Sequence, residues 1–204
     1  MDESRRQGLR KGLTALAVVL ALVGIGLAVY PFATDLWASR IQSGLTGDLN
    51  AMDREYRLGK VKTGDPLTRL EIPKLGVDVI VVEGTTLSAL RAGAGHYPKT
   101  PLPGESGNVA IAGHRTTFGR PFNRIDELTA GDRVILTTPV GRHVYEISRR
   151  PWVVDDQDWS VINDYPNRGS FLTLTSCHPE GSAEYRIVAR AQLVHSADSL
   201  ANAQ

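Results

Sequence analysis

The sequence predicts an all-β domain that follows a single membrane-spanning helix. Three observations support this prediction. The run from Leu13 to Ala33 contains no charged residue, and short stretches of alternating apolar and polar residues fill the chain from Leu67 onward. Turn-forming residues separate these stretches, in a chain that holds 20 Gly and 11 Pro. Because strands do not alternate with helices as in a doubly wound sheet, we expect a closed barrel or a sandwich.

The uncharged run is long enough to cross a bilayer. A helix over residues 13–33 spans about 30 Å, which is the thickness of the hydrocarbon core. Asp35 follows the run, and the basic tail 1–12 precedes it, with Arg5, Arg6, Arg10 and Lys11. The positive-inside rule then predicts a cytoplasmic N-terminus and an extracytoplasmic domain. A cleaved signal peptide is the alternative, but its apolar core is normally only about 7–15 residues, so we predict an uncleaved signal anchor.

The segment 34–66 is predicted to be a partly helical stalk or linker. Apolar residues recur in it at spacings of three or four, as on one face of a helix: Ile41, Leu45, Leu49 and Met52. Gly59, Gly64 and Pro66 then interrupt the helical pattern. We expect this stalk to lift the following domain off the membrane, and it contains no motif that indicates chemistry.

Eight stretches within the domain 67–195 have the alternation expected of β-strands. They are Thr68–Ile72, Val77–Val82, Asn108–Gly113, Arg133–Thr138, His143–Ser148, Trp152–Val154, Phe171–Ser176 and Tyr185–Val194. Two connections, Thr85–Gly93 and Asn123–Leu128, are predicted to contain short helices. Residues 196–204 are assigned to a C-terminal tail.

Composition excludes several classes of function. The formal net charge is +1 and no basic tract is interleaved with aromatic residues, which argues against a nucleic-acid partner. A single cysteine forms no internal disulfide and provides too few soft ligands for structural zinc, so no metal and no cofactor is expected. Neither a phosphate-binding glycine loop nor the GxSxG motif of serine hydrolases occurs.

Cys177, the only cysteine, is the candidate nucleophile. A small buried hydrophobic residue is the alternative interpretation. The residue lies at the end of a predicted strand, just before the turn sequence HPEGS, and a strand end is presented at the rim of a barrel. A free thiol outside the cytoplasm is a liability unless it is buried or used, and a nucleophilic thiol needs a base or cation beside it.

His114 is the leading candidate for that partner. Its stretch, VAIAGHRTTFG, also alternates and then ends in Gly-His before a turn, so an imidazole and a thiol can meet at one rim. The other histidines remain competitors. His143 is expected within a hairpin strand and His195 at the end of the last strand, whereas pattern alone excludes neither His96 in its loop nor His178 beside the cysteine.

Arg186 is the third candidate. It follows Cys177 by nine positions, across a short turn and one residue into the next predicted strand. Antiparallel pairing returns it to the cysteine, where a guanidinium can donate to an oxyanion. An exposed arginine on an edge strand is the alternative. Arg190 faces the same way but lies about 13 Å further along the strand.

Several stretches of the predicted domain resemble segments of the sortase family. TLTSC at 173–177, with arginine nine residues later, resembles the TLxTC…R signature of sortases, and AGHRTTFGRPFNRIDEL at 112–128 resembles the segment that carries their histidine. With LEIPKLGVDVIVVEG and GHYPKTPLPGESGNVAIAGHR, the chain is most similar to the class E sortases of actinobacteria. The resemblance covers Leu67 to Val194.

The resemblance implies an eight-stranded β-barrel with short connecting helices and an extracytoplasmic cysteine transpeptidase. Carried over by position, Cys177 is the nucleophile, His114 the general acid, and Arg186 stabilises the oxyanion or the thiolate. Ser176 departs from the family, where threonine usually precedes the cysteine; its hydroxyl remains available for a hydrogen bond to substrate. Tyr97, in GHYP, matches a tyrosine near the substrate groove of class E enzymes.

The resemblance also implies partners. The expected substrates are sorting-signal peptides of secreted surface proteins, of LPxTG or LAxTG type with a preference for LAxTG, and the acceptor is an amine of a lipid-linked peptidoglycan precursor. The GDPL stretch lacks the aromatic residue of a pilus-sortase lid and is interpreted as a strand start. No acidic pattern, at Glu105 or at Asp155–Asp156, demands calcium. A cell-wall cysteine peptidase or amidase and a non-catalytic tethered binding domain remain alternatives.

Overall fold

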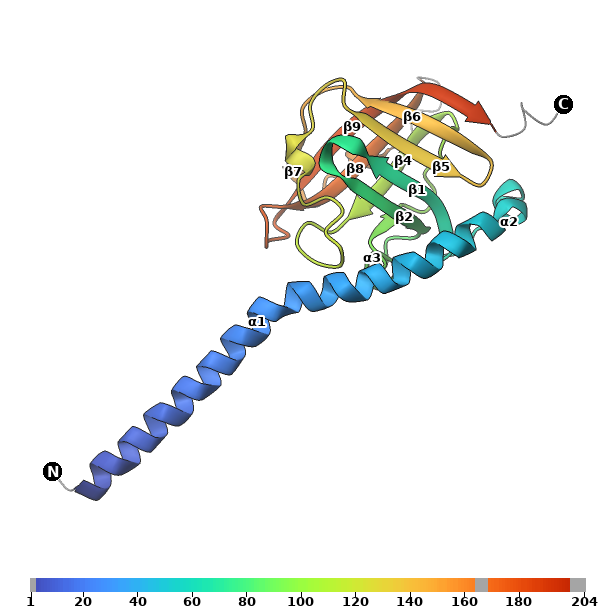
Figure 1. The fold of residues 1–204 in the computed structure, drawn as a ribbon. Coiled ribbons are helices and arrows are strands. Elements are labelled where there is room, and N and C mark those ends of the chain that lie inside the picture. Colours follow the sequence, from blue (N-terminus) through green and yellow to red (C-terminus); the bar gives the residue numbers. More distant parts are fainter. Residues whose placement is uncertain (1–2, 164–168, 199–204) are drawn as a thin grey trace.

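The computed structural model describes residues 3–163 and 169–198 as one long helix that leads into a β-barrel (Figure 1). The helices are α1 (Glu3–Ala51), α2 (Asp53–Arg57) and α3 (Leu87–Leu90), with 3-10 turns η1 (Pro73–Leu75), η2 (Ile125–Glu127) and η3 (Trp159–Ile162). The strands are β1 (Pro66–Ile72), β2 (Val77–Glu83), β3 (Ala94–His96), β4 (Gly107–Gly113), β5 (Arg133–Thr138), β6 (Gly141–Ile147), β7 (Trp152–Asp155), β8 (Ser170–His178) and β9 (Tyr185–Asp198).

Eight of these strands close into a barrel, which confirms the predicted fold class. Their order is β6-β5-β1-β2-β3-β4-β8-β9, and pairing between β6 and β9 completes the circle. The long strand β9 makes this closure possible because it pairs with β7 through its first residues and with β6 through its last. Alternate residues of the strands therefore point into a shared core. The core includes Leu70, Val81, Ile111, Val134, Leu136, Tyr145, Leu172, Leu174, Ile187 and Ala189.

All eight predicted strands are present, with shifts at their ends. The prediction included β7, which lies outside the closed circle, and missed β3, which lies inside it. Strand β3 has only three residues, too few for alternation to stand out. His96, expected in a loop, is its last residue, so that expectation is wrong. The short helices α3 and η2 lie within the predicted connecting helices.

The two ends of the domain also differ in extent from the prediction. The expected strand start in GDPL is confirmed, because β1 begins at Pro66. At the other end, β9 continues to Asp198, past the predicted end at Val194, because it pairs with β6 up to that residue. The remainder of the predicted tail, residues 199–204, lies outside the described residues.

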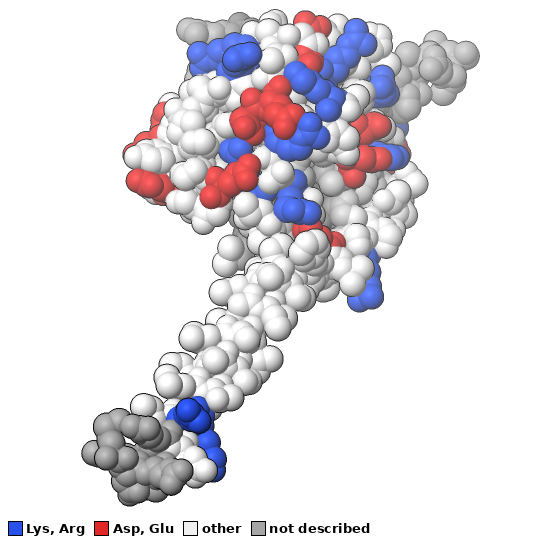
Figure 2. Space-filling view, turned by 60° about the vertical axis from the view of Figure 1, so that its left-hand side comes forward, with Lys and Arg blue, Asp and Glu red and all other residues white. Residues whose placement is uncertain are grey.

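Helix α1 has two halves with different surroundings. The part that projects from the barrel carries no charged side chain between its basic start and the domain (Figure 2). By length and composition it is apolar enough to cross a membrane. The axis bends where the helix reaches the barrel (Figure 1), and Pro31 lies in this part of the helix, where it removes a backbone hydrogen bond.

The second half of α1 lies against the barrel. The predicted apolar stripe faces it: Ile41 and Leu45 pack on a small cluster of Val82, Ala89 and Ala92, and Leu49 is buried. The expected stalk residues therefore contact the domain that follows them.

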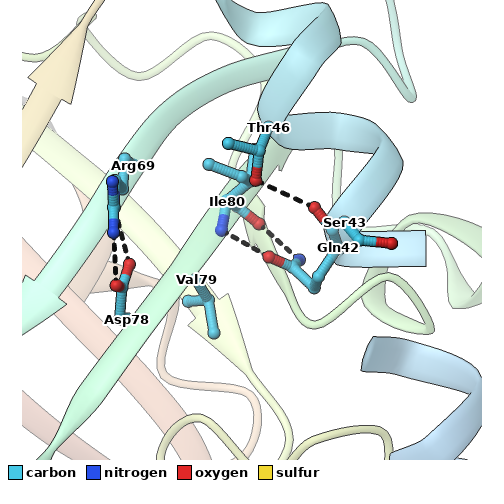
Figure 3. A pocket seen from close by; sticks show the side chains of 7 residues that line it. All are labelled: Gln42, Ser43, Thr46, Arg69, Asp78, Val79 and Ile80. Atoms are coloured by element: carbon cyan, nitrogen blue, oxygen red, sulfur yellow. Dashed lines mark hydrogen bonds and ion pairs between the residues drawn. The ribbon is translucent and has the colours of Figure 1, made fainter. Parts of the chain in front are cut away.

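The side chain of Gln42 joins α1 to β2 by hydrogen bonds (Figure 3). Its side-chain oxygen accepts from the Ile80 N–H at 2.6 Å, and its amide nitrogen donates to the carbonyls of Ile80 at 2.9 Å and Ala92 at 2.6 Å. Gln42 thus satisfies backbone groups at the edge of the barrel that would otherwise need water.

Candidate active site

The rim of the barrel where β4 and β8 end and β9 begins holds the three predicted functional residues. Strand β8 lies between β4 and β9 in the sheet, so Cys177 stands on the middle strand. Directly opposite it in the antiparallel ladder is Arg186 of β9. Residues opposite one another across such a ladder point to the same face, with Cβ atoms about 4.5–5.5 Å apart. The predicted return of the arginine to the cysteine is therefore confirmed by the strand register.

His114 reaches the same rim from the other side. Strand β4 runs parallel to β8 with Ala112 beside Thr175, so two further residues bring His114 level with Cys177. Both residues then lie on the outer face of the barrel, because the alternate residues Ile111 and Leu174 point into the core. Arg186 thus flanks Cys177 from the neighbouring strand β9, about 4.8 Å away in the sheet. His114 follows the last residue of β4, on the other side of β8.

Ser176 ties the two strand ends together. Its hydroxyl donates to the carbonyl of Gly113 at 2.8 Å, and its side chain is 3% exposed. The hydrogen bond therefore joins the residue before His114 to the residue before Cys177. The assignment of Ser176 to substrate binding stays a prediction, and in the described structure the hydroxyl has this internal partner.

Gly113 allows the chain after His114 to fold back on the strand end. A Cβ atom at this position would lie 2.6 Å from the Phe122 ring, so a larger residue would displace that ring. Phe122 is fully buried, and its N–H donates to the carbonyl of His114 at 3.3 Å. The glycine therefore fixes where His114 leaves the sheet.

Arg115 joins the segment after His114 to the turn after Cys177. Its guanidinium is 4% exposed and donates to the carbonyl of Asn123 at 3.1 Å and to the carboxylate of Asp126 at 2.7 Å. The same group lies 3.4 Å from Nδ1 of His178 and 3.5 Å from a carboxylate oxygen of Glu180. A single buried cation thus holds both sides of the rim, a role that the sequence motifs did not reveal.

The three predicted side chains are not yet joined to one another by hydrogen bonds. The imidazole of His114 lies against the Phe118 ring, with ring centroids 5.3 Å apart. Nη1 of Arg186 donates to the carbonyls of Ala183 at 2.8 Å and Tyr185 at 2.9 Å. The thiol of Cys177 is partly exposed and reduced. Each of the three groups therefore keeps its own neighbours at the rim.

Electrostatics favour a neutral imidazole at this rim. Burial lowers the pKa of His114 below its ordinary value, because a charged imidazolium loses water there. At neutral pH the ring therefore has a free nitrogen lone pair that can accept a proton from a thiol.

Tyr97 borders the same outer face. Its hydroxyl lies 3.0 Å from the Thr175 hydroxyl, two residues before the cysteine along β8. The ring of Trp159, from η3, meets the Tyr97 ring edge-on at 6.5 Å and is 56% exposed. The two rings thus form an aromatic wall beside the rim. Sequence patterns did not indicate Trp159, because it lies in an irregular connection.

Of the competing histidines, His178 remains at the rim next to Cys177, where its Nδ1 lies 3.4 Å from the Arg115 guanidinium, whereas His96 and His143 lie elsewhere. His96 is buried with Nδ1 2.7 Å from Glu83 and Nε2 2.8 Å from Thr100. His143 is buried in β6, where Nδ1 lies 2.9 Å from the hydroxyl of Ser196. Within residues 3–163 and 169–198 there is no cluster of side chains that could hold a metal ion.

Comparisons with known proteins agree with this site. A family model of the sortase domain matches residues 70–194, more than half of the chain. SrtE1 of Streptomyces coelicolor is 29% identical over 218 aligned residues, which cover 94% of this chain and 62% of that relative. Sortase D of Bacillus subtilis is 38% identical over 136 residues, which cover 66% of each protein. The chain therefore spans less than two thirds of the length of these relatives.

A solved structure shows the same fold. Sortase E1 from Streptomyces coelicolor, solved with a tripeptide in its active site, aligns with a TM-score of 0.63 and 31% identity, covering 69% of this chain and 95% of that one. The residues matched by the family model include His114, Cys177 and Arg186, and the E-type relatives support a class E-like protein. The chain accordingly belongs to the sortase family, whose members are cysteine transpeptidases.

Proposed function

We propose that this protein is a membrane-anchored cysteine transpeptidase that cleaves a C-terminal LPxTG- or LAxTG-type sorting signal between Thr and Gly. It then transfers the acyl group to an amine of a lipid-linked cell-wall precursor, which anchors surface proteins to peptidoglycan. The single observation that carries this proposal is the position of Cys177 between His114 and Arg186 on one face of the rim. Family membership and the apolar half of α1 support it.

The first half of the reaction forms a thioester. The neutral imidazole of His114 takes the thiol proton while the sulfur of Cys177 bonds to the Thr carbonyl carbon. The carbonyl oxygen becomes an oxyanion. When the intermediate collapses, the Thr–Gly C–N bond breaks, and the His114 imidazolium gives its proton to the departing glycine amine.

Arg186 is proposed to stabilise the oxyanion. Its Nη1 donates to two carbonyls of the turn, which fixes the plane of the guanidinium. A guanidinium has five N–H donors, so Nε and Nη2 carry the three that face no hydrogen-bond acceptor among the described residues. A charged donor held in advance where charge develops stabilises the transition state by a few kcal/mol.

The second half of the reaction transfers the acyl group. An acceptor amine attacks the thioester carbonyl and gives its proton to His114, and the C–S bond breaks. The thiolate of Cys177 then recovers its proton from the imidazolium. The anchor confines the enzyme, the secreted substrate and the lipid-linked acceptor to one surface, which raises the effective concentration of each.

Tyr97 and Ser176 are proposed to act on the substrate side of this site. Tyr97 and Trp159 offer an aromatic wall for the sorting peptide, and the Tyr97 hydroxyl contacts Thr175, two residues before the cysteine on β8. We further propose an N-terminus in the cytoplasm with the barrel outside, an orientation that the basic residues before the apolar run support.

A transpeptidation assay tests the proposal. The full-length protein in detergent is given LAxTG or LPxTG peptides and an amine acceptor, and products are identified by mass spectrometry. We expect transfer by the wild type, a peptide adduct on Cys177, and loss of activity by about three orders of magnitude or more in Cys177→Ala.

Two outcomes would contradict the proposal. Hydrolysis without transfer at saturating amine would favour the peptidase or amidase. Full activity of Cys177→Ala would favour a non-catalytic binding domain. The thermal midpoint of Cys177→Ala serves as the control, and we expect it to stay close to that of the wild type because the thiol is partly exposed.

A further inference from the structure

The chain after His114 meets the membrane-proximal part of α1. We call residues 115–120 the Phe118 loop. The Phe118 N–H donates to the hydroxyl of Thr34 at 3.4 Å, and the Gly119 N–H donates to the carboxylate of Asp35 at 2.9 Å. The guanidinium of Arg120 forms an ion pair with Asp35 at 2.8 Å. Three consecutive residues of the loop therefore bind one turn of the helix.

Aromatic packing extends this contact to the imidazole. The Phe118 ring lies between Trp37 of α1, at a centroid distance of 6.0 Å, and His114, at 5.3 Å. Ala38 is 2% exposed, and a Cβ atom at Gly119 would lie only 3.7 Å from its methyl group. The loop and the helix thus approach closely, and a row of side chains connects α1 to His114.

The backbone of the Phe118 loop needs external support. Phe118 and Arg120 have φ angles of +52° and +46°, and Gly119 between them has +79°. Left-handed φ angles are unfavourable for bulky L-residues and persist only where surrounding contacts hold them. The contacts to Thr34 and Asp35 supply that support on both sides of Gly119.

Helix α1 is itself fixed to the barrel. Gln42, two turns beyond Asp35, binds both backbone groups of Ile80 (Figure 3). Its amide nitrogen also donates to the carbonyl of Ala92. The helix is therefore a fixed support for the loop and not a passive tether.

From these contacts we infer that Asp35 of α1, together with Phe118, positions the imidazole of His114 over the thiol of Cys177. Both are positioning residues, because they act through His114. The inference rests on the proposed function, in which His114 transfers the proton. It makes the membrane-proximal helix part of the active-site architecture.

The electrostatic surroundings agree with this geometry. Desolvation lowers the pKa of His114, and Phe118 is the aromatic ring in contact with it. The charged groups packed around this contact are Asp35 and Arg120, which pair with each other, and Arg91, whose guanidinium lies 6.0 Å from the Phe118 centroid. Arg186 flanks Cys177 from β9 on the far side of the rim, and Arg115 lies between the segment after His114 and Glu180.

The experiment compares variants of the full-length chain in lipid nanodiscs. Asp35→Ala removes the ion pair and the acceptor for Gly119, whereas Asp35→Asn keeps an acceptor oxygen and removes the charge. Phe118→Ala removes the ring contact. Asp48→Ala is the matched control, because Asp48 is an exposed acid on the same helix. The readouts are kcat and KM of transpeptidation, amide hydrogen exchange over residues 115–120, and the NMR titration of His114 in a Cys177→Ala background.

We expect kcat to fall about ten-fold or more in Asp35→Ala and Phe118→Ala, with KM within about two-fold of the wild-type value. The kcat of Asp35→Asn should lie between that of the alanine variants and that of the wild type. The kcat of Asp48→Ala should equal the wild-type value. Hydrogen exchange of residues 115–120 should accelerate in both alanine variants. The pKa of His114 should rise in Phe118→Ala, because the ring would gain water.

The inference would be overturned if both alanine variants kept the wild-type values of kcat, of amide hydrogen exchange over residues 115–120 and of the His114 pKa. A wild-type enzyme that is inactive with every peptide would overturn the proposed function instead, while exchange and titration would still test the positioning. If Phe118→Ala unfolds, Phe118→Leu and Asp35→Asn are measured in its place. Lower kcat and faster exchange in them would support the inference, and wild-type values would overturn it.

Discussion

The two sides of the catalytic rim are held in different ways. Cys177 and Arg186 lie opposite one another in the ladder between β8 and β9, so backbone hydrogen bonds fix their relative position. His114 lies just beyond the last residue of β4, and the chain that follows it is held by side chains of Arg115, Thr34 and Asp35. The thiol side is therefore secured by the barrel itself, whereas the imidazole side depends on contacts from distant parts of the chain.

Among residues outside the three proposed catalytic ones, the largest effect should come from removing Arg115, the cation that joins the two sides. Arg115→Ala deletes hydrogen bonds to Asn123 and Asp126 and the contacts to His178 and Glu180. We expect a loss of about 2–3 kcal/mol in the free energy of unfolding and a fall in kcat/KM of at least about 100-fold. Denaturant unfolding and the transpeptidation assay measure the two quantities.

Arg124→Ala is the matched control for that variant. Its guanidinium pairs with Glu127 at the surface, with both side chains about half exposed, and such a pair contributes about 0–1 kcal/mol. Equal stability of the two arginine variants would show that Arg115 does not join the sides of the rim.

A smaller effect is expected at Ser176. Ser176→Ala removes the hydrogen bond to the Gly113 carbonyl and leaves a buried acceptor without its partner, which costs about 1–2 kcal/mol. We expect kcat to fall about ten-fold, because His114 is then less well fixed beside Cys177.

Ser176→Thr separates the two roles proposed for this hydroxyl. The variant keeps the hydroxyl, so kcat should stay within about three-fold of the wild-type value. An increase of KM in Ser176→Ala with unchanged kcat would instead assign the hydroxyl to substrate binding, as the family resemblance implies.

Tyr97→Phe tests the aromatic wall of Tyr97 and Trp159, which belongs to neither side of the rim. The change removes the hydrogen bond between Tyr97 and Thr175 and keeps the packing against Trp159. Because one neutral hydrogen bond contributes about 0.5–1.5 kcal/mol, kcat/KM should fall by at most about ten-fold, mainly through KM. A change in kcat alone would place Tyr97 in the chemistry and not in substrate binding.

The smallest effect concerns the protonation of His114. Its pKa is lowered in the folded protein, so the unfolded chain binds a proton at higher pH than the folded chain does. The contribution of neutral His114 to the free energy of unfolding is fully present above the ordinary histidine pKa of about 6.5. It is lost as the pH falls through the lower pKa that His114 has in the folded protein. Comparing the free energy of unfolding of wild type and His114→Gln between neutral and acidic pH isolates this contribution. A constant difference across that range would contradict the shift.

The thiol side could be predicted from local patterns, whereas on the imidazole side these patterns predicted only the strand that ends before His114. Alternation gave the strands that carry Cys177 and Arg186, and a short turn between them implied antiparallel pairing. Strand β3 escaped detection because it has three residues, two of them Ala94 and Gly95. The parallel pairing of β4 with β8 joins segments that are more than 50 residues apart, and no local pattern encodes it.

The support of His114 was missed for the same physical reason. Asp35 and Trp37 lie about 80 positions before the loop that they contact, so only the folded chain brings them together. The apolar stripe of Ile41 and Leu45 predicted the helix correctly, but the same stripe fits a free stalk and a docked helix. Burial of Arg115 likewise depends on how the loop folds back.

The continuity of α1 has a practical consequence for protein production. A shortened protein that begins at Leu67, where the predicted barrel begins, keeps all but the first residue of the eight barrel strands but discards Asp35, Trp37 and Gln42. One that begins near Pro31 removes most of the apolar run and retains all three side chains. Preparations of these two lengths share a barrel yet differ in what surrounds the imidazole, so turnover measured on the shorter one describes an enzyme with an unsupported histidine.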